Sequence, residues 1–374
     1  MKFTVSSASL LTHLQTISRV INSKNTLPIL DNFLFNLHDG VLTITAADME
    51  TTLVTTMELD SSEGSGVVAL SSKILLDTLK EFSDEPLTFN IDDTNFAMVI
   101  KSVSGTYNFN GLNADEYPQV KSLEAGHNTL TIPANVLSMG VTSTSFATSD
   151  DEIRPIMCGI YFDINPESVT FVASDGHKLV RIKTVAAKGD SECSFILPKK
   201  PVSLLKSILP KESGDVRVEF DTNFVHFTLS NYQMICRQTE GVYPKYNSVI
   251  PENNPNKATV DRVSLLNVLR RISVYANQST NLVKMEFSEG KITVSAQDFD
   301  FSTSAVESVA CSYEGSFMKI GFKCAIIIDM LNNISSENVI IEMSDSSRAG
   351  LILPLEQSET EDVLMLSMPM MLPE

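Results

Sequence analysis

The chain has 374 residues, of which 43% are hydrophobic and 20% are charged, a balance that is ordinary for a globular protein. The length suffices for about three domains of common size, each with its own core. The formal net charge of −18 opposes simple adsorption to DNA or to an anionic membrane. The start, Met1-Lys-Phe-Thr-Val, lacks the apolar run of a secretion signal, and no apolar stretch is long enough to span a bilayer. We therefore expect a cytoplasmic protein without membrane segments.

The cysteines give no sign of a disulfide framework or a zinc site. Their number is odd and none belongs to a Cys-x-x-Cys pair. We expect five free thiols and no metal or other cofactor. They stand at Cys158, Cys193, Cys236, Cys311 and Cys324.

The first third of the chain reads as a strand, a helix and further strands around a second helix. Ser6-Ser7 is an N-cap signal, and the apolar spacing after it predicts a helix over 8–20. Ser71-Ser72 introduces a second helix over 72–82 in the same way. Alternating segments predict strands at 1–5, 29–37, 40–47, 51–59, 67–70, 87–91, 96–101 and 106–110.

The same order restarts twice downstream. It restarts at Thr129 after a polar link, and at Ala258 after a second link that contains Pro251 and Pro255. The predicted helices are 133–146, 201–209, 263–275 and 324–334. Helix propensity is poor from Gly140 onward, so we expect the helix over 133–146 to be short or distorted.

Recurring landmarks indicate three copies of one unit. An alternating strand runs into Asp48, Asp175 and Asp298 at spacings of 127 and 123 residues. The pairs Tyr117-Pro118, Tyr243-Pro244 and Met368-Pro369 recur at a similar interval. We predict an α+β protein of three similar domains, 1–125, 126–250 and 251–374, each with two helices packed on antiparallel β-sheets.

The charge is unevenly distributed between the predicted helices and the remainder. The helical segments with their flanks, taken as 7–24, 71–82, 132–147, 198–211, 261–276 and 321–334, contain twelve Lys or Arg and four acids. They carry +8, which leaves −26 for the rest of the chain. One surface made of helices can therefore be positive on a strongly acidic protein.

Several patterns permit a chemical and a structural interpretation. Ser174-Asp175-Gly176-His177 contains the residue types of a hydrolase triad, but neighbours around a turn point apart, and a hairpin turn is the better interpretation. Asp92-Asp93 and the pair Asp298 and Asp300 supply too few ligands for a metal, so we interpret them as solvated acids. The methionines near the C-terminus fit either a core or a surface that accepts varied apolar partners; they are Met365, Met368, Met370 and Met371.

End to end, the chain resembles the bacterial DNA polymerase III beta subunit family, the sliding clamps. The resemblance is carried by Met1-Lys-Phe-Thr-Val, Thr26-Leu-Pro-Ile-Leu, Ser174-Asp-Gly-His-Lys-Leu, Tyr243-Pro-Lys-Tyr and Met368-Pro-Met. It implies the DNA clamp fold and a head-to-tail homodimer that closes as a ring with its helices facing the hole. The function implied is that of a non-catalytic processivity factor that encircles double-stranded DNA without sequence preference. Its implied partners are the DNA polymerase III catalytic subunit, the clamp-loader complex and other proteins with clamp-binding motifs.

Site residues are transferred from the family position by position. The implied peptide-binding pocket consists of Met157, Ser174, Gly176, His177, Lys178, Leu179, Pro244, Ser248, Val249, Leu366, Met368 and Met370. The implied DNA contacts are Lys24, Arg154, Ile156, Lys199 and Lys200. The implied dimer interface contains Tyr107, Phe109, Val274 and Tyr275. No catalytic or metal-binding residue is implied.

The sequence departs from the family at Ser248, where Arg is frequent, at Ile156, where an aromatic residue is usual, and in the extension Pro373-Glu374. Two other classes of function remain open. An enzyme acting on nucleic acid would need a metal or acid–base cluster, and an adhesin-like β-rich scaffold would need an export signal.

Overall fold

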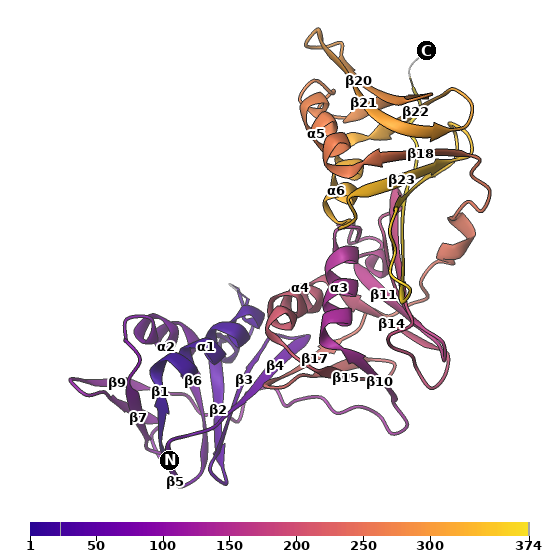
Figure 1. The fold of residues 1–374 in the computed structure, drawn as a ribbon. Coiled ribbons are helices and arrows are strands. Elements are labelled where there is room, and N and C mark those ends of the chain that lie inside the picture. The colour runs from indigo at the N-terminus through magenta and orange to yellow at the C-terminus, as the bar shows by residue number, and fades with distance from the viewer. Residues whose placement is uncertain (23, 373–374) are drawn as a thin grey trace. The chain divides into compact units, whose positions relative to one another are not determined.

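The computed structural model describes residues 1–22 and 24–372, which form two compact units. One unit comprises Met1–Asn135 and Ser203–Gln238, and the other comprises Val136–Val202 and the chain from Thr239 onward. The extension Pro373-Glu374 lies outside the described residues. Figure 1 shows both units, with many of their helices and strands labelled.

The first unit contains two antiparallel sheets. The five-stranded sheet has the order β5 (Ser61–Glu63), β1 (Lys2–Ser6), β7 (Pro86–Ile91), β8 (Ala97–Lys101), β9 (Thr106–Asn110). The eight-stranded sheet has the order β10 (Asn128–Pro133), β15 (Asp215–Phe220), β16 (Phe224–Thr228), β17 (Tyr232–Arg237), β4 (Thr51–Met57), β3 (Val41–Ala47), β2 (Asn32–His38), β6 (Gly66–Ser71).

The helices α1 (Ser7–Ile17) and α2 (Ser72–Leu79) lie side by side against these strands (Figure 1). The Ser6 hydroxyl caps α1 by accepting a hydrogen bond from the Ser9 amide at 3.1 Å. Apolar residues at the helical spacing of α1 are fully buried, so one face of the helix joins the core. They are Leu10, Leu14 and Ile17.

The second unit is built on one twelve-stranded antiparallel sheet. Its order is β14 (Cys193–Pro198), β11 (Gly159–Ile164), β12 (Val169–Ser174), β13 (Lys178–Thr184), β25 (Glu361–Ser367), β24 (Gly350–Pro354), β23 (Asn338–Met343), β18 (Asn256–Asp261), β21 (Thr303–Glu314), β20 (Lys291–Asp298), β19 (Leu282–Ser288), β22 (Met318–Lys323). The pairing of β13 with β25 aligns Leu179 with Leu366, which are nearly 190 residues apart in the sequence.

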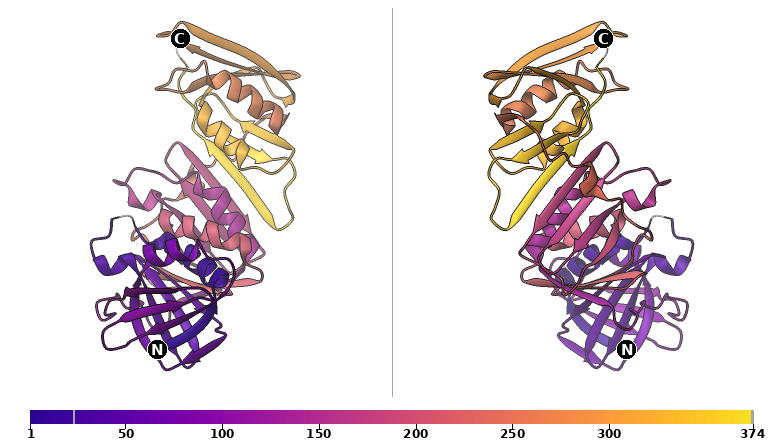
Figure 2. Two further views of the ribbon diagram at one scale, coloured as in Figure 1. Left: turned by 90° about the vertical axis from the view of Figure 1, so that its left-hand side faces the viewer. Right: turned by 90° about the vertical axis from the view of Figure 1, so that its right-hand side faces the viewer.

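The helices α5 (Arg262–Ser273) and α6 (Cys324–Asn332) pack together in this unit (Figure 2). The Asp261 carboxylate caps α5 by accepting from the Ser264 amide at 2.7 Å. The chain passes from one unit to the other within α3 (Ala134–Ser145), within α4 (Lys199–Ile208) and after Gln238. Short 3₁₀ segments are η1 (Ser18–Val20), η2 (Pro28–Asp31), η3 (Pro155–Met157), η4 (Leu209–Lys211) and η5 (Tyr246–Val249).

Each of the six predicted helices is present, but three local predictions are wrong. The helix α3 is a regular helix of 12 residues rather than a short or distorted one, because burial of Leu137 and Val141 outweighs weak propensity. Pro28 begins a 3₁₀ turn where a strand was expected, and the strand β5 was missed.

The three landmark aspartates have one structural role. Each stands at the end of a strand, and its Oδ1 accepts hydrogen bonds from backbone amides two and three residues ahead. The bonds run to Asp48 from Glu50 and Thr51, to Asp175 from His177 and Lys178, and to Asp298 from Asp300 and Phe301. The recurring sequence thus produces a recurring turn.

Candidate peptide-binding pocket

The turn between β12 and β13 is fixed by its own side chains. Gly176 has φ +90°, a conformation that favours glycine, and its amide donates to the Ser174 hydroxyl at 3.1 Å. That hydroxyl donates in turn to the Lys178 carbonyl at 2.7 Å, so it is not directed at His177. Ser174 therefore serves the turn, as the hairpin interpretation predicts, and makes no triad with the neighbouring Asp175 and His177.

The turn also holds a largely buried ion pair. Lys178 Nζ lies 3.1 Å from Asp175 Oδ2, and both side chains are mostly covered. Burial of Asp175 opposes its ionisation, but the Lys178 and His177 amides and the Lys178 ammonium outweigh that effect and hold the pKa of this carboxyl below its usual value. Asp175 is thus a charged anchor of the turn at neutral pH.

A cavity of about 280 Å³ opens beside this turn. Residues from four separate parts of the sequence line it, and apolar side chains predominate. They are Met157, Ser174, Gly176, His177, Lys178, Leu179, Tyr243, Pro244, Lys245, Tyr246, Val249, Leu366 and Met368. An apolar cavity with a few polar groups at its edge is typical of a site for apolar anchor residues.

A tightly packed cluster supports the floor of the cavity. Leu179 and Leu366, paired across β13 and β25, are buried together with Tyr243 and Tyr246. The rings of Tyr161 and Tyr243 stack with centroids 4.6 Å apart. The Tyr246 hydroxyl donates to Asp163 Oδ2 at 2.7 Å, and burial followed by this bond to a carboxylate raises the pKa of Tyr246. The floor is therefore well ordered before any ligand binds.

The end of the described chain forms one rim of the cavity. The Met368 amide donates to the His177 carbonyl at 2.8 Å, which places Met368 over the turn. Two residues on, the Met370 amide donates to the Gly321 carbonyl of β22 at 2.8 Å. A Cβ at Gly321 would lie 2.6 Å from the Met370 carbonyl oxygen, so only glycine permits this approach. The tail is thus anchored on both sides of Pro369.

Two of the expected pocket residues are not among those that line the cavity. Met370 is bonded to β22, and the exposed Ser248 donates its hydroxyl hydrogen to the Lys245 carbonyl at 2.7 Å. Conversely, Tyr243, Lys245 and Tyr246 line the cavity and were not expected to do so. The motif Tyr243-Pro-Lys-Tyr is the sequence signal for these residues, although the family resemblance implies a pocket role for Pro244 alone.

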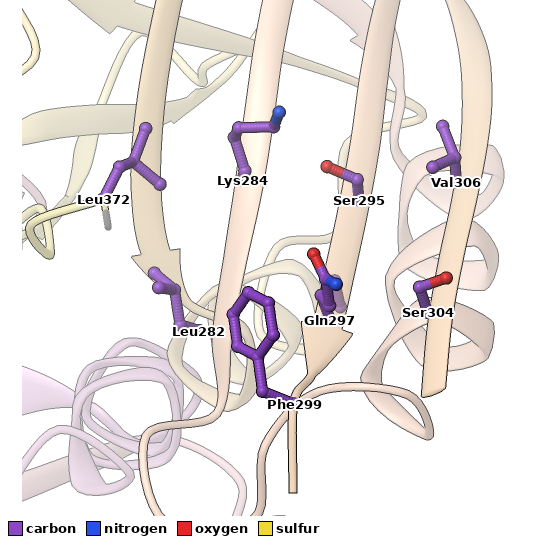
Figure 3. Close-up of a pocket in the computed structure, with 9 residues that line it drawn as sticks. Leu282, Lys284, Ser295, Gln297, Phe299, Ser304, Val306 and Leu372 are labelled. Carbon is purple, nitrogen blue, oxygen red and sulfur yellow. The ribbon is translucent and has the colours of Figure 1, made fainter. Parts of the chain in front are cut away.

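A larger groove of about 450 Å³ crosses the outward face of β19, β20 and β21. Figure 3 shows its lining in the close-up: Leu282 and Lys284, Ser295 and Gln297, Ser304 and Val306 on successive strands, with Phe299 at one end and Leu372 at one side. Polar and apolar side chains are mixed along its floor. We consider the smaller cavity the stronger candidate, because its lining is mainly apolar and supported by a buried cluster.

The expected DNA contacts differ in their surroundings. Lys24 is exposed, and Lys199 and Lys200 are partly covered. Lys199 Nζ forms an ion pair with Asp150, and Arg154 Nε lies 2.9 Å from Asp151 Oδ2. Ile156 is half-buried against the apolar cluster below the cavity, so it supports the pocket as well.

The expected interface residues expose apolar side chains to solvent at two places. Tyr107 on β9 is 40% exposed and meets the Phe82 ring edge-on at 5.4 Å. Phe109 on the same strand is half-buried. Directly after α5, Val274 is 78% exposed and Tyr275 is 42% exposed.

Residues 1–22 and 24–372 contain neither a metal-binding cluster nor a membrane-spanning helix. No group of three or more His, Cys, Asp and Glu side chains in this part is arranged to hold a metal ion. In the same part, no helix is both long enough and apolar enough to cross a membrane.

Comparison with known proteins gives one consistent result. Three family models match: the N-terminal domain of the DNA polymerase III beta subunit at 1–121, its central domain at 131–245 and its C-terminal domain at 247–371. A curated relative, the beta sliding clamp of Haemophilus influenzae, is 27% identical over 369 residues, covering 98% of this chain and 99% of its own.

Solved structures agree in fold over the full length of both chains. The DNA polymerase III beta subunit of Pseudomonas aeruginosa is 24% identical with a TM-score of 0.94. The beta subunit of Thermotoga maritima is 26% identical with a TM-score of 0.90. This chain therefore belongs to the DNA polymerase III beta subunit family, the bacterial sliding clamps, and is a processivity clamp of DNA replication rather than an enzyme.

Proposed function

We propose that two copies of the chain join head to tail and close a ring around duplex DNA in the cytoplasm. Support comes from two unlike strand edges. The strand β9 is the last strand of its sheet, and residues 303–310 of β21 pair with β20 alone among the described residues. An open strand edge favours pairing with another strand, and two unlike edges on one chain favour head-to-tail contact.

Exposed apolar side chains accompany both edges. Tyr107 and Phe109 belong to β9, and Val274 and Tyr275 follow α5, which packs against β21. Val306 on β21 is itself 70% exposed. Burial of such side chains is the main source of stability in permanent dimers. We propose that these two surfaces meet in the dimer.

We also propose that the chain consists of three repeated domains, residues 1–125, 126–250 and 251–374.

We propose that the helices of the ring face the DNA. The helical segments with their flanks carry +8 while the remainder carries −26, so the net positive charge is concentrated in these segments. Lys24, Arg154, Lys199 and Lys200 would contact phosphates without reading the sequence, and Ile156 would lie beside them. Such contacts are weak, and retention on DNA would depend on the closed ring.

We propose that the cavity beside the β12–β13 turn binds short segments of partner proteins through Leu and Phe anchors. The partners would be the DNA polymerase III catalytic subunit, the clamp-loader complex and other proteins that carry clamp-binding motifs. Its lining supports this role because it is apolar, small and preformed. A few buried apolar anchors typically give micromolar affinity. Met370 and Ser248 would act at its edge rather than in its lining.

The pair of unlike open strand edges carries this proposal, and the molecular mass in solution tests it. Light scattering at micromolar concentration should give about twice the chain mass of 41.1 kDa, and electron micrographs should contain closed rings. A single-chain mass at that concentration would refute the dimer.

A further inference from the structure

Two cations that we assign to the DNA-facing surface are already paired with acids of a single loop. The acidic loop, residues 149–154, reads Ser-Asp-Asp-Glu-Ile-Arg. Within it, Asp151 Oδ2 lies 2.9 Å from Arg154 Nε. The preceding residue, Asp150, pairs with Lys199 at the start of α4. Both carboxylates therefore occupy positions where a phosphate oxygen would bind the same cations.

Hydrogen bonds within the loop fix its backbone and the Asp151 carboxylate. The Ser149 amide donates to the Met157 carbonyl at 2.8 Å and closes the loop at its base. Inside the loop, the Asp151 amide donates to the Ser149 hydroxyl at 3.1 Å, and Asp151 Oδ1 accepts from the Ile153 amide at 3.1 Å. Asp151 thus uses one oxygen to shape the loop and the other to bind Arg154. Because Asp151 is held in place by these bonds, little conformational entropy is lost when it pairs with Arg154.

The Asp150 carboxylate carries its negative charge beside Lys199. The hydrogen bond from Lys199 and its charge lower the pKa of Asp150, so this carboxylate is ionised at neutral pH. Asp150 and Lys199 are both accessible to solvent, as are Asp151 and Arg154. Ion pairs of this kind are weak, and a polyanion can replace the carboxylate.

We propose that Asp150 and Asp151 occupy Lys199 and Arg154 in place of DNA phosphates. The two carboxylates must leave these cations before the cations contact the duplex. The inference rests on the proposed orientation of these cations toward DNA. If so, the ring has little direct affinity for duplex, because the exchange of a carboxylate for a phosphate on each cation changes the binding free energy little. A clamp that slides benefits from such a balance, since strong phosphate contacts would hold it in place.

The chain contains a matched control in the same loop. Glu152 lies next to Asp151 and carries the same charge, yet it makes no ion pair within the described residues. Glu152→Gln therefore removes one negative charge from the loop without releasing a cation. Asp150→Asn and Asp151→Asn remove one charge each and release Lys199 or Arg154. Asn at 151 also keeps a side-chain oxygen for the Ile153 amide.

The test measures binding of the full-length protein to a short fluorescent duplex by anisotropy over a series of salt concentrations. In the wild-type protein each displaced carboxylate takes up a counterion while the phosphate releases one, so removal of one carboxylate should steepen the slope of log K against log salt by about 0.9. We expect the double variant Asp150→Asn/Asp151→Asn to bind about tenfold more tightly at low salt, with a slope steeper by about 1.8. Glu152→Gln should leave the slope unchanged. Equal effects of Glu152→Gln and Asp151→Asn would overturn the proposal, because bulk charge would then explain both.

A second pair of variants separates this inference from the proposed DNA surface. Lys199→Gln/Arg154→Gln should cancel the gain when added to the double Asn variant. If those two cations matter in the wild-type protein while the Asn variants change nothing, the competition is refuted and the DNA surface stands. If neither set of variants alters binding, the assignment of Lys199 and Arg154 to the DNA surface is wrong, and the competition is refuted with it.

Discussion

Replacement of the Met368 side chain by that of alanine should weaken peptide binding by a predictable and modest factor. Met368 lines the cavity and is 41% exposed in the free protein, so a ligand can cover at most that share of its surface. Full burial of a methionine side chain contributes about 1.5–3 kcal/mol, and the remaining share is therefore worth roughly 0.6–1.2 kcal/mol. Met368→Ala should raise the Kd about three- to sevenfold, since about 1.4 kcal/mol corresponds to a tenfold change.

The tail supplies its own control. Met371 is 94% exposed, does not line the cavity and stands three residues further on. Fluorescence anisotropy with a labelled peptide carrying Leu and Phe anchors should show the loss for Met368→Ala and no change for Met371→Ala. Both variants should keep the wild-type Tm, because neither side chain belongs to the core. Equal affinities of the two variants would refute the assignment of this rim to peptide binding.

Three further predictions concern the interface, the turn and the tail. Phe109→Asp combined with Val274→Asp should convert the dimer to monomer in light scattering, because charge would be buried without a partner, and an unchanged mass would exclude these surfaces from the contact. The folded-state pKa of Asp175 lies below 3.8, so its ion pair and its hydrogen bonds from backbone amides stabilise the fold at neutral pH. This stabilisation is lost as the pH falls below 3.8 and the carboxylate is protonated. The Tm deficit of Asp175→Asn should accordingly shrink on acidification, and a deficit independent of pH would contradict this cause. Gly321→Ala should detach the tail from β22, because its Cβ would lie 2.6 Å from the Met370 carbonyl oxygen. It should then weaken peptide binding at an almost unchanged Tm; unchanged binding would show that Met368 needs no such anchor.

The sequence was sufficient for features that depend on local or periodic signals. The six helices follow from apolar spacing, with clear N-cap residues such as Ser6 and Asp261. The repeat was visible because Asp48, Asp175 and Asp298 each close the same kind of turn, which requires a short acceptor side chain at a fixed place. Family resemblance added most of the cavity, including Leu179 and Leu366, whose pairing across 187 positions no local pattern contains.

Features that depend on tertiary packing could not be predicted in this way. The regular helix α3 contradicts its own propensity because its apolar side chains are buried, and burial is not a property of the segment alone. Tyr246 belongs to a motif that the sequence displays, but its hydrogen bond to Asp163, 83 residues earlier, is a tertiary contact that no local pattern contains. The pairing of Lys199 with Asp150 likewise joins positions 49 residues apart, so the sequence revealed the cations but not their partners.

The central claim is that a closed ring, rather than attraction to phosphates, keeps this acidic protein on DNA. It is tested most directly by loading the protein onto nicked circular duplex with an ATP-driven clamp loader and then measuring retention while the salt concentration is raised. Direct phosphate binding falls steeply with salt, whereas a closed ring is insensitive to it. We predict salt-resistant retention on the circle and rapid release once the circle is cut. Persistence on linear DNA with unblocked ends, or loss from intact circles as soon as salt is raised, would contradict the account.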